Sequence, residues 1–146
     1  MRKPTTRLVL PGVGLLAVLI AAGTALAAGT TLRLTGPSGT LKADTRYTVT
    51  ASGTGHGYKL FAYEGGELAG ARAAIGCYPT EAAEYARYKP SPNVHVYLGS
   101  YGVHGGFSRS WTLIARNPGP RSFCAYLASS SGSKTYAHAS LHWTNR

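Results

Sequence analysis

Apolar and polar residues alternate along most of the chain after residue 30. In the segment 45–53, for example, Tyr47, Val49 and Ala51 share one face, and the residues between them are threonines. This two-residue period is typical of antiparallel strands with one buried and one solvated face. The pattern predicts seven strands, in the segments 30–36, 45–53, 58–66, 93–99, 107–115, 121–130 and 136–144.

Glycine- and proline-rich segments separate these strands, and we interpret them as turns. They include SGTGHG at 52–57, SYGVHGG at 100–106 and NPGP at 117–120. Seven short strands joined by such turns are the pattern of a β-sandwich. The expected fold class is therefore all-β, an antiparallel two-sheet sandwich of about seven strands with one short helix in a crossover loop.

That helix is predicted in the alanine-rich segment 67–92, where the alternation breaks down. Thr80 is suited to be its N-cap, and Pro90 and Pro92 end it, which gives a helix from about Glu81 to Tyr88. The order of charges suits a helix dipole, with two acidic residues in the first turn and two basic residues near the end: Glu81, Glu84, Arg87 and Lys89. On a short exposed helix we expect both acidic side chains to be solvated.

The N-terminus has the three parts of a secretory signal peptide. Residues 1–7 are basic, an apolar stretch follows, and Ala25-Leu26-Ala27 supplies the small residues of a cleavage site. The alternative is an uncleaved membrane anchor, but Pro11 and two glycines interrupt the apolar stretch. We expect a signal peptide at 1–27 and one mature, secreted domain at 28–146, which would meet a membrane only if the signal peptide were retained.

The chain is basic, with a net charge of +10. Without the three basic residues of the signal peptide, 12 basic residues face 5 acidic ones, which leaves +7. Such a protein is attracted to anionic polymers such as cell-wall polymers and acidic glycans. Its cations are scattered, and no run of them tracks a phosphate backbone, so we expect no nucleic-acid partner.

Cys77 and Cys124 are the two cysteines of the chain, and in an exported protein they are expected to form one structural disulfide. The bridge would join the helical crossover to a late strand. Two arrangements remain open for that strand. If Phe123, Ala125 and Leu127 face the core, then Cys124 points to the outer side of its sheet and fastens a covering loop there. If Cys124 points inward, the crossover must pass over the open end of the sandwich.

The order TRYTVTASG, YKLFAYEGG, FSRSWTLIARNPGPRSFCAYLASS and YAHASLHWT resembles a bacterial immunoglobulin-like β-sandwich of the small secreted actinobacterial type. The resemblance covers nearly all of 28–146 and implies an immunoglobulin-like fold without implying a ligand. The chain departs from antibody domains in two respects. Its first cysteine lies in the crossover, and Ser122 stands where a tyrosine corner would place Tyr.

The sequence offers little for catalysis or for a metal. Only five acidic residues occur, no Gly-x-Ser-x-Gly motif is present, and His138 and His142 lie too far apart along one strand to bind one ion. We therefore expect no enzyme, no cofactor and no metal. The alternatives are a small secreted hydrolase that uses His95 or His104 with Glu81 or Glu84, and a protease-inhibitor-like effector with SYGVHGG as its exposed loop.

Tyrosines and basic residues gather around the predicted helix and suit stacking on a sugar or docking to a protein. This candidate ligand surface comprises Tyr78, Tyr85, Arg87, Tyr88, Lys89, Tyr97 and Tyr101. The competing interpretation is that these side chains cover the sheet. From the sequence, we expect a secreted, non-catalytic immunoglobulin-like module with a binding or structural role at the cell surface or outside the cell. Its partner would be a cell-wall polymer, a glycan or another extracellular protein.

Overall fold

The computed structural model describes residues 21–22, 29–66, 76–88, 95–116 and 118–146. These contain seven strands and one helix: β1 (Ala21–Ala22), β2 (Thr31–Thr35), β3 (Thr40–Leu41), β4 (Arg46–Gly66), α1 (Glu81–Tyr88), β5 (His95–Ile114), β6 (Gly119–Ala128) and β7 (Thr135–Asn145). The short β1 lies within the expected signal peptide and pairs with β2. No helix in the described ranges is long and apolar enough to cross a membrane.

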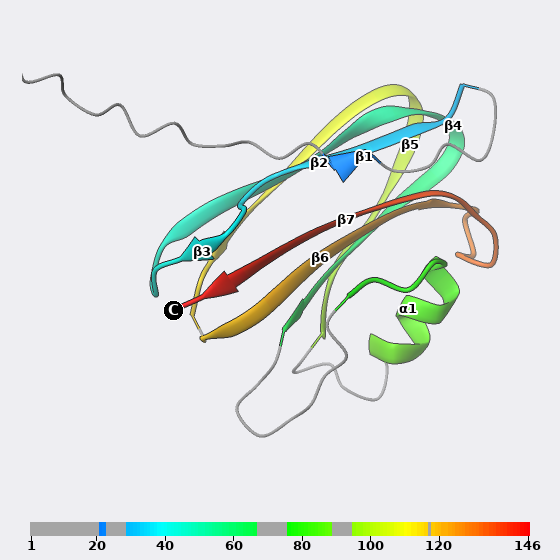
Figure 1. The fold of residues 1–146 in the computed structure, drawn as a ribbon. Helices are drawn as coiled ribbons and strands as arrows, with labels where there is room; N and C mark the ends of the chain where they lie inside the picture. The colour runs from blue at the N-terminus through cyan, green and yellow to red at the C-terminus, as the bar shows by residue number, and fades with distance from the viewer. Residues whose placement is uncertain (1–20, 23–28, 67–75, 89–94, 117) are drawn as a thin grey trace, which may run out of the picture.

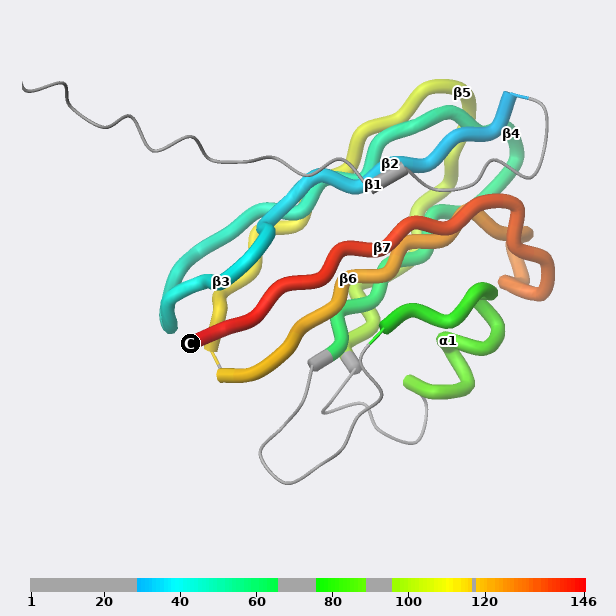
Figure 2. The backbone as a smooth tube through the Cα atoms, viewed as in Figure 1, coloured from blue at the N-terminus to red at the C-terminus, as the bar shows by residue number. Residues whose placement is uncertain are grey.

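The expected two-sheet sandwich is wrong, and with it the immunoglobulin-like arrangement. All seven strands belong to one sheet, in the order β1-β2-β4-β6-β7-β3, and β5 pairs with the opposite edge of β4. The sheet is mixed, because β3 and β7 run parallel whereas the other pairs are antiparallel. It curls into a half-barrel, and β4 and β5 bend together as one long ribbon (Figure 1, Figure 2).

The expected and the observed folds differ at two glycine-rich segments that have the composition of turns. SGTGHG lies inside β4, and SYGVHGG lies inside β5, so four expected strands are two long ones. The pairing of β4 with β5 shifts register between His56 and Tyr58, which makes Gly57 an extra residue with a positive φ of 71°. Such a bulge bends a continuous strand and increases its twist. Glycine therefore marks curvature here, and not chain reversal.

The concave face of the half-barrel holds the main hydrophobic core. It collects buried side chains from β2, β4, β5, β6 and β7: Leu32, Leu34, Tyr47, Val49, Ala51, Leu60, Ala62, Val103, Trp111, Phe123, Ala125, Leu127, Ala137, Ala139, Leu141 and Trp143. A strictly alternating sequence is compatible with one curled sheet and with two stacked sheets, because each strand has one buried face in both folds.

A second, smaller core lies on the outer face of β4 and β6, where α1 covers the sheet (Figure 1). It is formed by Phe61, Tyr63, Cys124, Tyr126 and Ala128, so β6 is buried on both sides from Ser122 to Ala128. Cys124 therefore points away from the main core. Of the two arrangements that the sequence left open, the structure has the one in which the disulfide fastens a covering segment to the outside of the sheet.

Candidate functional site

The helix α1 has the bounds predicted from the sequence, and it is capped as predicted. The Ala83 amide donates to the Thr80 hydroxyl at 3.3 Å, and the Glu84 amide donates to the Thr80 carbonyl at 3.1 Å. The Glu81 amide donates to the hydroxyl of Thr135 at 2.9 Å, so β7 satisfies a further free amide of the first turn. These bonds fix the start of α1 against the sheet.

The expectation that Glu81 and Glu84 are solvated is wrong. Their residues are only 4% and 0% exposed, because the first turn faces the sheet and not the solvent. The Tyr63 hydroxyl donates to the Glu81 carboxylate. That carboxylate also lies against Gly132, where an added Cβ would come within 1.9 Å of Oε2. The acidic residues that suit a helix dipole here also bind the sheet beneath.

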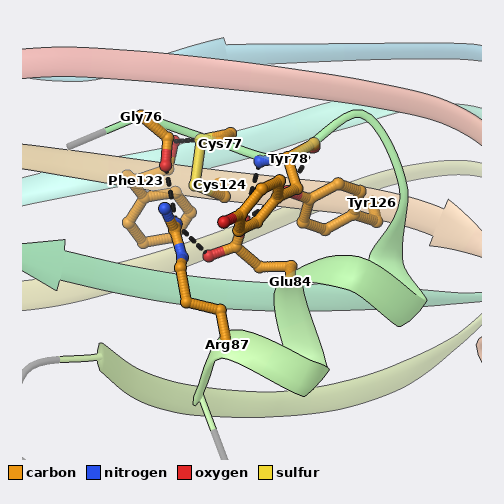
Figure 3. A network of polar contacts seen from close by, with 8 residues as sticks. All are labelled: Gly76, Cys77, Tyr78, Glu84, Arg87, Phe123, Cys124 and Tyr126. Carbon is orange, nitrogen blue, oxygen red and sulfur yellow. Dashed lines mark hydrogen bonds and ion pairs between the residues drawn. A yellow bond between two sulfur atoms is a disulfide. The ribbon is translucent and has the colours of Figure 1, made fainter. Parts of the chain in front are cut away.

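Glu84 is the centre of a polar network between α1, the segment before it and β6 (Figure 3). One carboxylate oxygen accepts from the Tyr78 amide and from the Tyr126 hydroxyl, each at 2.9 Å. The other pairs with the Arg87 guanidinium, which also donates to the Gly76 carbonyl at 2.6 Å. A buried charge is tolerated when it is paired and hydrogen-bonded in this way.

Burial changes how the groups under α1 ionise. It raises the pKa of the Tyr63 hydroxyl, and the hydrogen bond to Glu81 raises it further. Burial also raises the pKa of Tyr126, with the nearby Glu84 carboxylate as the next cause. The pKa of Glu81 rises above its ordinary value through burial, although the bond from Tyr63 partly opposes this. Both tyrosines therefore remain protonated donors at physiological pH.

The Cys77–Cys124 disulfide stands beside this network (Figure 3). It ties the segment that precedes α1 to the outer face of β6, with the two Cα atoms 5.6 Å apart. The Tyr126 hydroxyl, two residues along β6 from Cys124, shares its one proton between the Glu84 carboxylate and the Tyr78 carbonyl, which is 2.8 Å away. The segment is therefore held to β6 by one covalent bond and by hydrogen bonds. The disulfide indicates an oxidising environment.

Five members of the predicted ligand surface meet around α1. Tyr78 and Tyr85 are 41% and 45% exposed. The Arg87 guanidinium lies 4.7 Å from the centre of the Tyr78 ring. The rings of Tyr85 and Tyr88 are 6.0 Å apart, and Tyr88 in turn lies 5.9 Å from Tyr97, so a row of aromatic rings runs from the exposed side of α1 to the sheet.

The other two members are not part of this group. Tyr101 packs against the main core on the concave side, where its ring contacts Trp111 and the Arg109 guanidinium. Lys89 lies outside the described residues. A bulge in β5 explains the separation. Strict alternation would place residues four apart on one face, but a register shift falls between the pairs that contain Tyr97 and Tyr101 and leaves them on opposite faces.

The carboxylates and histidines of the hydrolase alternative are separated by the register of the sheet. His104 pairs with His56, whereas Glu81 binds Tyr63, seven residues further along β4. Glu81 and Glu84 lie under α1 on the outer face of β4 and β6, and among the described residues no hydrogen bond or ion pair joins either of them to His104. The side chain of His95 lies outside the described part of the chain. SYGVHGG, the loop of the inhibitor alternative, is strand and not loop.

Sequence reasoning missed the position of His56 opposite His104, because each residue belongs to a different expected turn. In the described residues, no group of three or more His, Cys, Asp or Glu side chains is placed to hold a metal ion. Comparison with known protein families finds no match, and neither does comparison with curated proteins.

Proposed function

We propose that this protein is secreted and acts outside the cell as a non-catalytic binding module for an anionic cell-wall polymer or glycan. The observation that carries the proposal is the exposure of two tyrosines, Tyr78 in the segment before α1 and Tyr85 on α1, with the Arg87 guanidinium 4.7 Å from the centre of the Tyr78 ring. Aromatic rings stack on the apolar faces of sugars, and the Arg87 guanidinium, which is paired with Glu84, supports the Tyr78 ring by a cation–π contact.

The site is held rigidly, which favours binding because little order has to be gained when a ligand arrives. The disulfide fixes the segment that carries Tyr78, and the buried Glu84 binds both the Tyr78 amide and Arg87. A buried network of this kind is well suited to a positioning role. The net charge of +7 that remains after removal of residues 1–27 attracts anionic polymers from a distance.

Export rests on the basic, apolar and Ala-x-Ala parts of residues 1–27, together with the disulfide. Both features suit a protein that leaves the reducing cytoplasm. Secretion is tested by N-terminal sequencing of protein recovered from the culture medium, with residue 28 expected at the start. Recovery of the intact N-terminus in the membrane fraction would contradict it.

Binding is tested by co-sedimentation with purified cell wall and by an array of neutral and acidic glycans. The double variant Tyr78→Ala/Tyr85→Ala should lose retention. It should also fold, because the Tyr78 contacts within the network come from its main chain. Ile114→Ala is the matched control, since Ile114 is an exposed apolar side chain on β5. The proposal would be contradicted if only a protein partner retained the unchanged protein. It would also be contradicted if the double variant and Ile114→Ala were retained equally.

A further inference from the structure

The continuous pairing of β4 with β5 places two histidines opposite each other on neighbouring strands. His56 and His104 are direct cross-strand partners, and their ring centroids are 6.3 Å apart with the planes almost perpendicular. Both residues are exposed. Directly opposed residues of an antiparallel pair have Cβ atoms about 5 Å apart, which is close enough for both side chains to reach one ion.

The neighbours of these two rings leave them accessible. Gly55 and Gly105 form the adjoining pair on one side, and Gly57 is the bulge residue. Nε2 of His104 lies over Gly102, at 3.7 Å from where a Cβ would stand. With glycines around them, the imidazoles can change their χ torsions to bring a nitrogen of each to about 2.0 Å from a shared ion.

We propose that His56 and His104 form a surface site for a divalent transition metal, with Cu²⁺ as the ion that it binds most tightly. Imidazole nitrogen is a preferred ligand of Cu²⁺, Ni²⁺ and Zn²⁺, and for a given set of nitrogen ligands the affinity is highest for Cu²⁺. The oxidising environment that the disulfide indicates keeps copper in the divalent state.

The protein supplies two ligands to this site, and water completes the coordination. This follows from the described residues, in which no third His, Cys, Asp or Glu joins the pair. Lys59 pairs with Gly102 and is the cation nearest along the ladder, so it weakens the binding of a positive ion. The ion is therefore exchangeable and exposed, unlike a closed structural zinc site, and the fold does not depend on it.

The test is titration of the purified, oxidised full chain with Cu²⁺, followed by calorimetry and by electron paramagnetic resonance. We expect one ion per chain and a spectrum with two nitrogen ligands. His56→Gln and His104→Gln should each weaken binding by on the order of tenfold or more, since losing a direct ligand costs at least as much as losing an outer partner. Zn²⁺ should bind more weakly than Cu²⁺.

His142→Gln is the matched control, because His142 is exposed on β7 and away from the pair. It should bind Cu²⁺ as the unchanged protein does, and Lys59→Gln should bind slightly more tightly at low salt. Unchanged binding by both His56→Gln and His104→Gln would overturn the proposal. A spectrum of the unchanged protein with a single nitrogen ligand would also overturn it, and that measurement does not depend on whether a variant folds.

Discussion

The hydroxyl of Tyr47 donates a hydrogen bond to the carboxylate of Glu64 at 2.6 Å, although both residues belong to β4. Seventeen residues separate them. A straight strand of that length would hold them more than about 50 Å apart. The bond therefore joins the two ends of one strand across the concave side and is a direct measure of how far β4 curls.

Tyr47→Phe is expected to lower the free energy of unfolding by about 1.5 kcal/mol, because it removes a hydrogen bond to a charged group that is partly buried. Tyr85→Phe is the control, since its ring is exposed on α1. Urea unfolding followed by tryptophan fluorescence measures both. An equal effect of the two substitutions would mean that the bond across the concave side contributes no net stability.

The bulge at Gly57 should depend on the backbone conformation that glycine allows. Gly57 has a φ of 71° and open space at its Cβ position, so Gly57→Ala meets no atom but is strained, at a cost of about 1 kcal/mol. Gly106→Ala is the matched control, because Gly106 also has open space but no positive φ. Thermal unfolding of the two variants compares them, and equal midpoints would contradict a strained bulge.

Gly132 should be required for a different reason, namely the approach of Glu81. A Cβ at Gly132 would stand 1.9 Å from the carboxylate oxygen, whereas Gly39 has a similar φ of 70° and open space. Gly39→Ala thus measures the backbone strain alone. Gly132→Ala should cost about 1–3 kcal/mol more, as overpacking does. Hydrogen exchange should locate the excess loosening in α1, and loosening confined to the 129–134 turn would contradict the contact.

Stability should fall as the pH rises through the ionisation of Glu81. Burial raises the pKa of this carboxyl in the folded protein above its ordinary value of 4.5. The folded state consequently binds more protons than the unfolded state between these two pKa values. The contribution of Glu81 to stability is therefore fully present below pH 4.5 and is lost as the pH rises through the folded-state pKa. Glu81→Gln removes this loss.

The difference in unfolding free energy between Glu81→Gln and the unchanged protein should therefore change in favour of the variant from pH 4 upward. This difference should change by about 1.4 kcal/mol for every tenfold by which folding lowers the acid dissociation constant of Glu81. Urea unfolding at a series of pH values measures it. Thr48→Ser, on the exposed side of β4, is a control that should follow the unchanged protein at every pH. A difference that stays constant with pH would contradict the burial of an ionising Glu81.

Reduction of the disulfide should loosen α1 and the segment before it while the sheet stays folded. The bridge fastens this segment to the outer face of β6, and the main core lies on the other face. The chain-entropy contribution for a loop of this length is about 4 kcal/mol, most of which would be lost locally. Hydrogen exchange with and without reductant should show faster exchange at 76–88 than in β2 and β7. Cooperative loss of protection throughout would contradict this separation.

The sequence alone determined the features that depend on near neighbours. The alternation in 45–53 and 136–144 indicated which side chains are buried, and Thr80 with the acidic first turn indicated where α1 begins. The pairing of Cys77 with Cys124 followed from their number, because two thiols in an oxidising compartment have only each other as partners.

Only the tertiary structure decided where the strands continue and on which side of the sheet these residues lie. A glycine with a positive φ permits either a chain reversal or a bulge, and the residues around Gly57 do not distinguish the two. Whether the chain reverses or continues depends on whether the residues after the glycine pair with other strands. The part of β4 after Gly57 pairs with β5 along one edge and with β6 along the other, so the strand continues. The same long-range pairing buried Glu81 and Glu84, set Cys124 on the outer face, and placed His56 opposite His104.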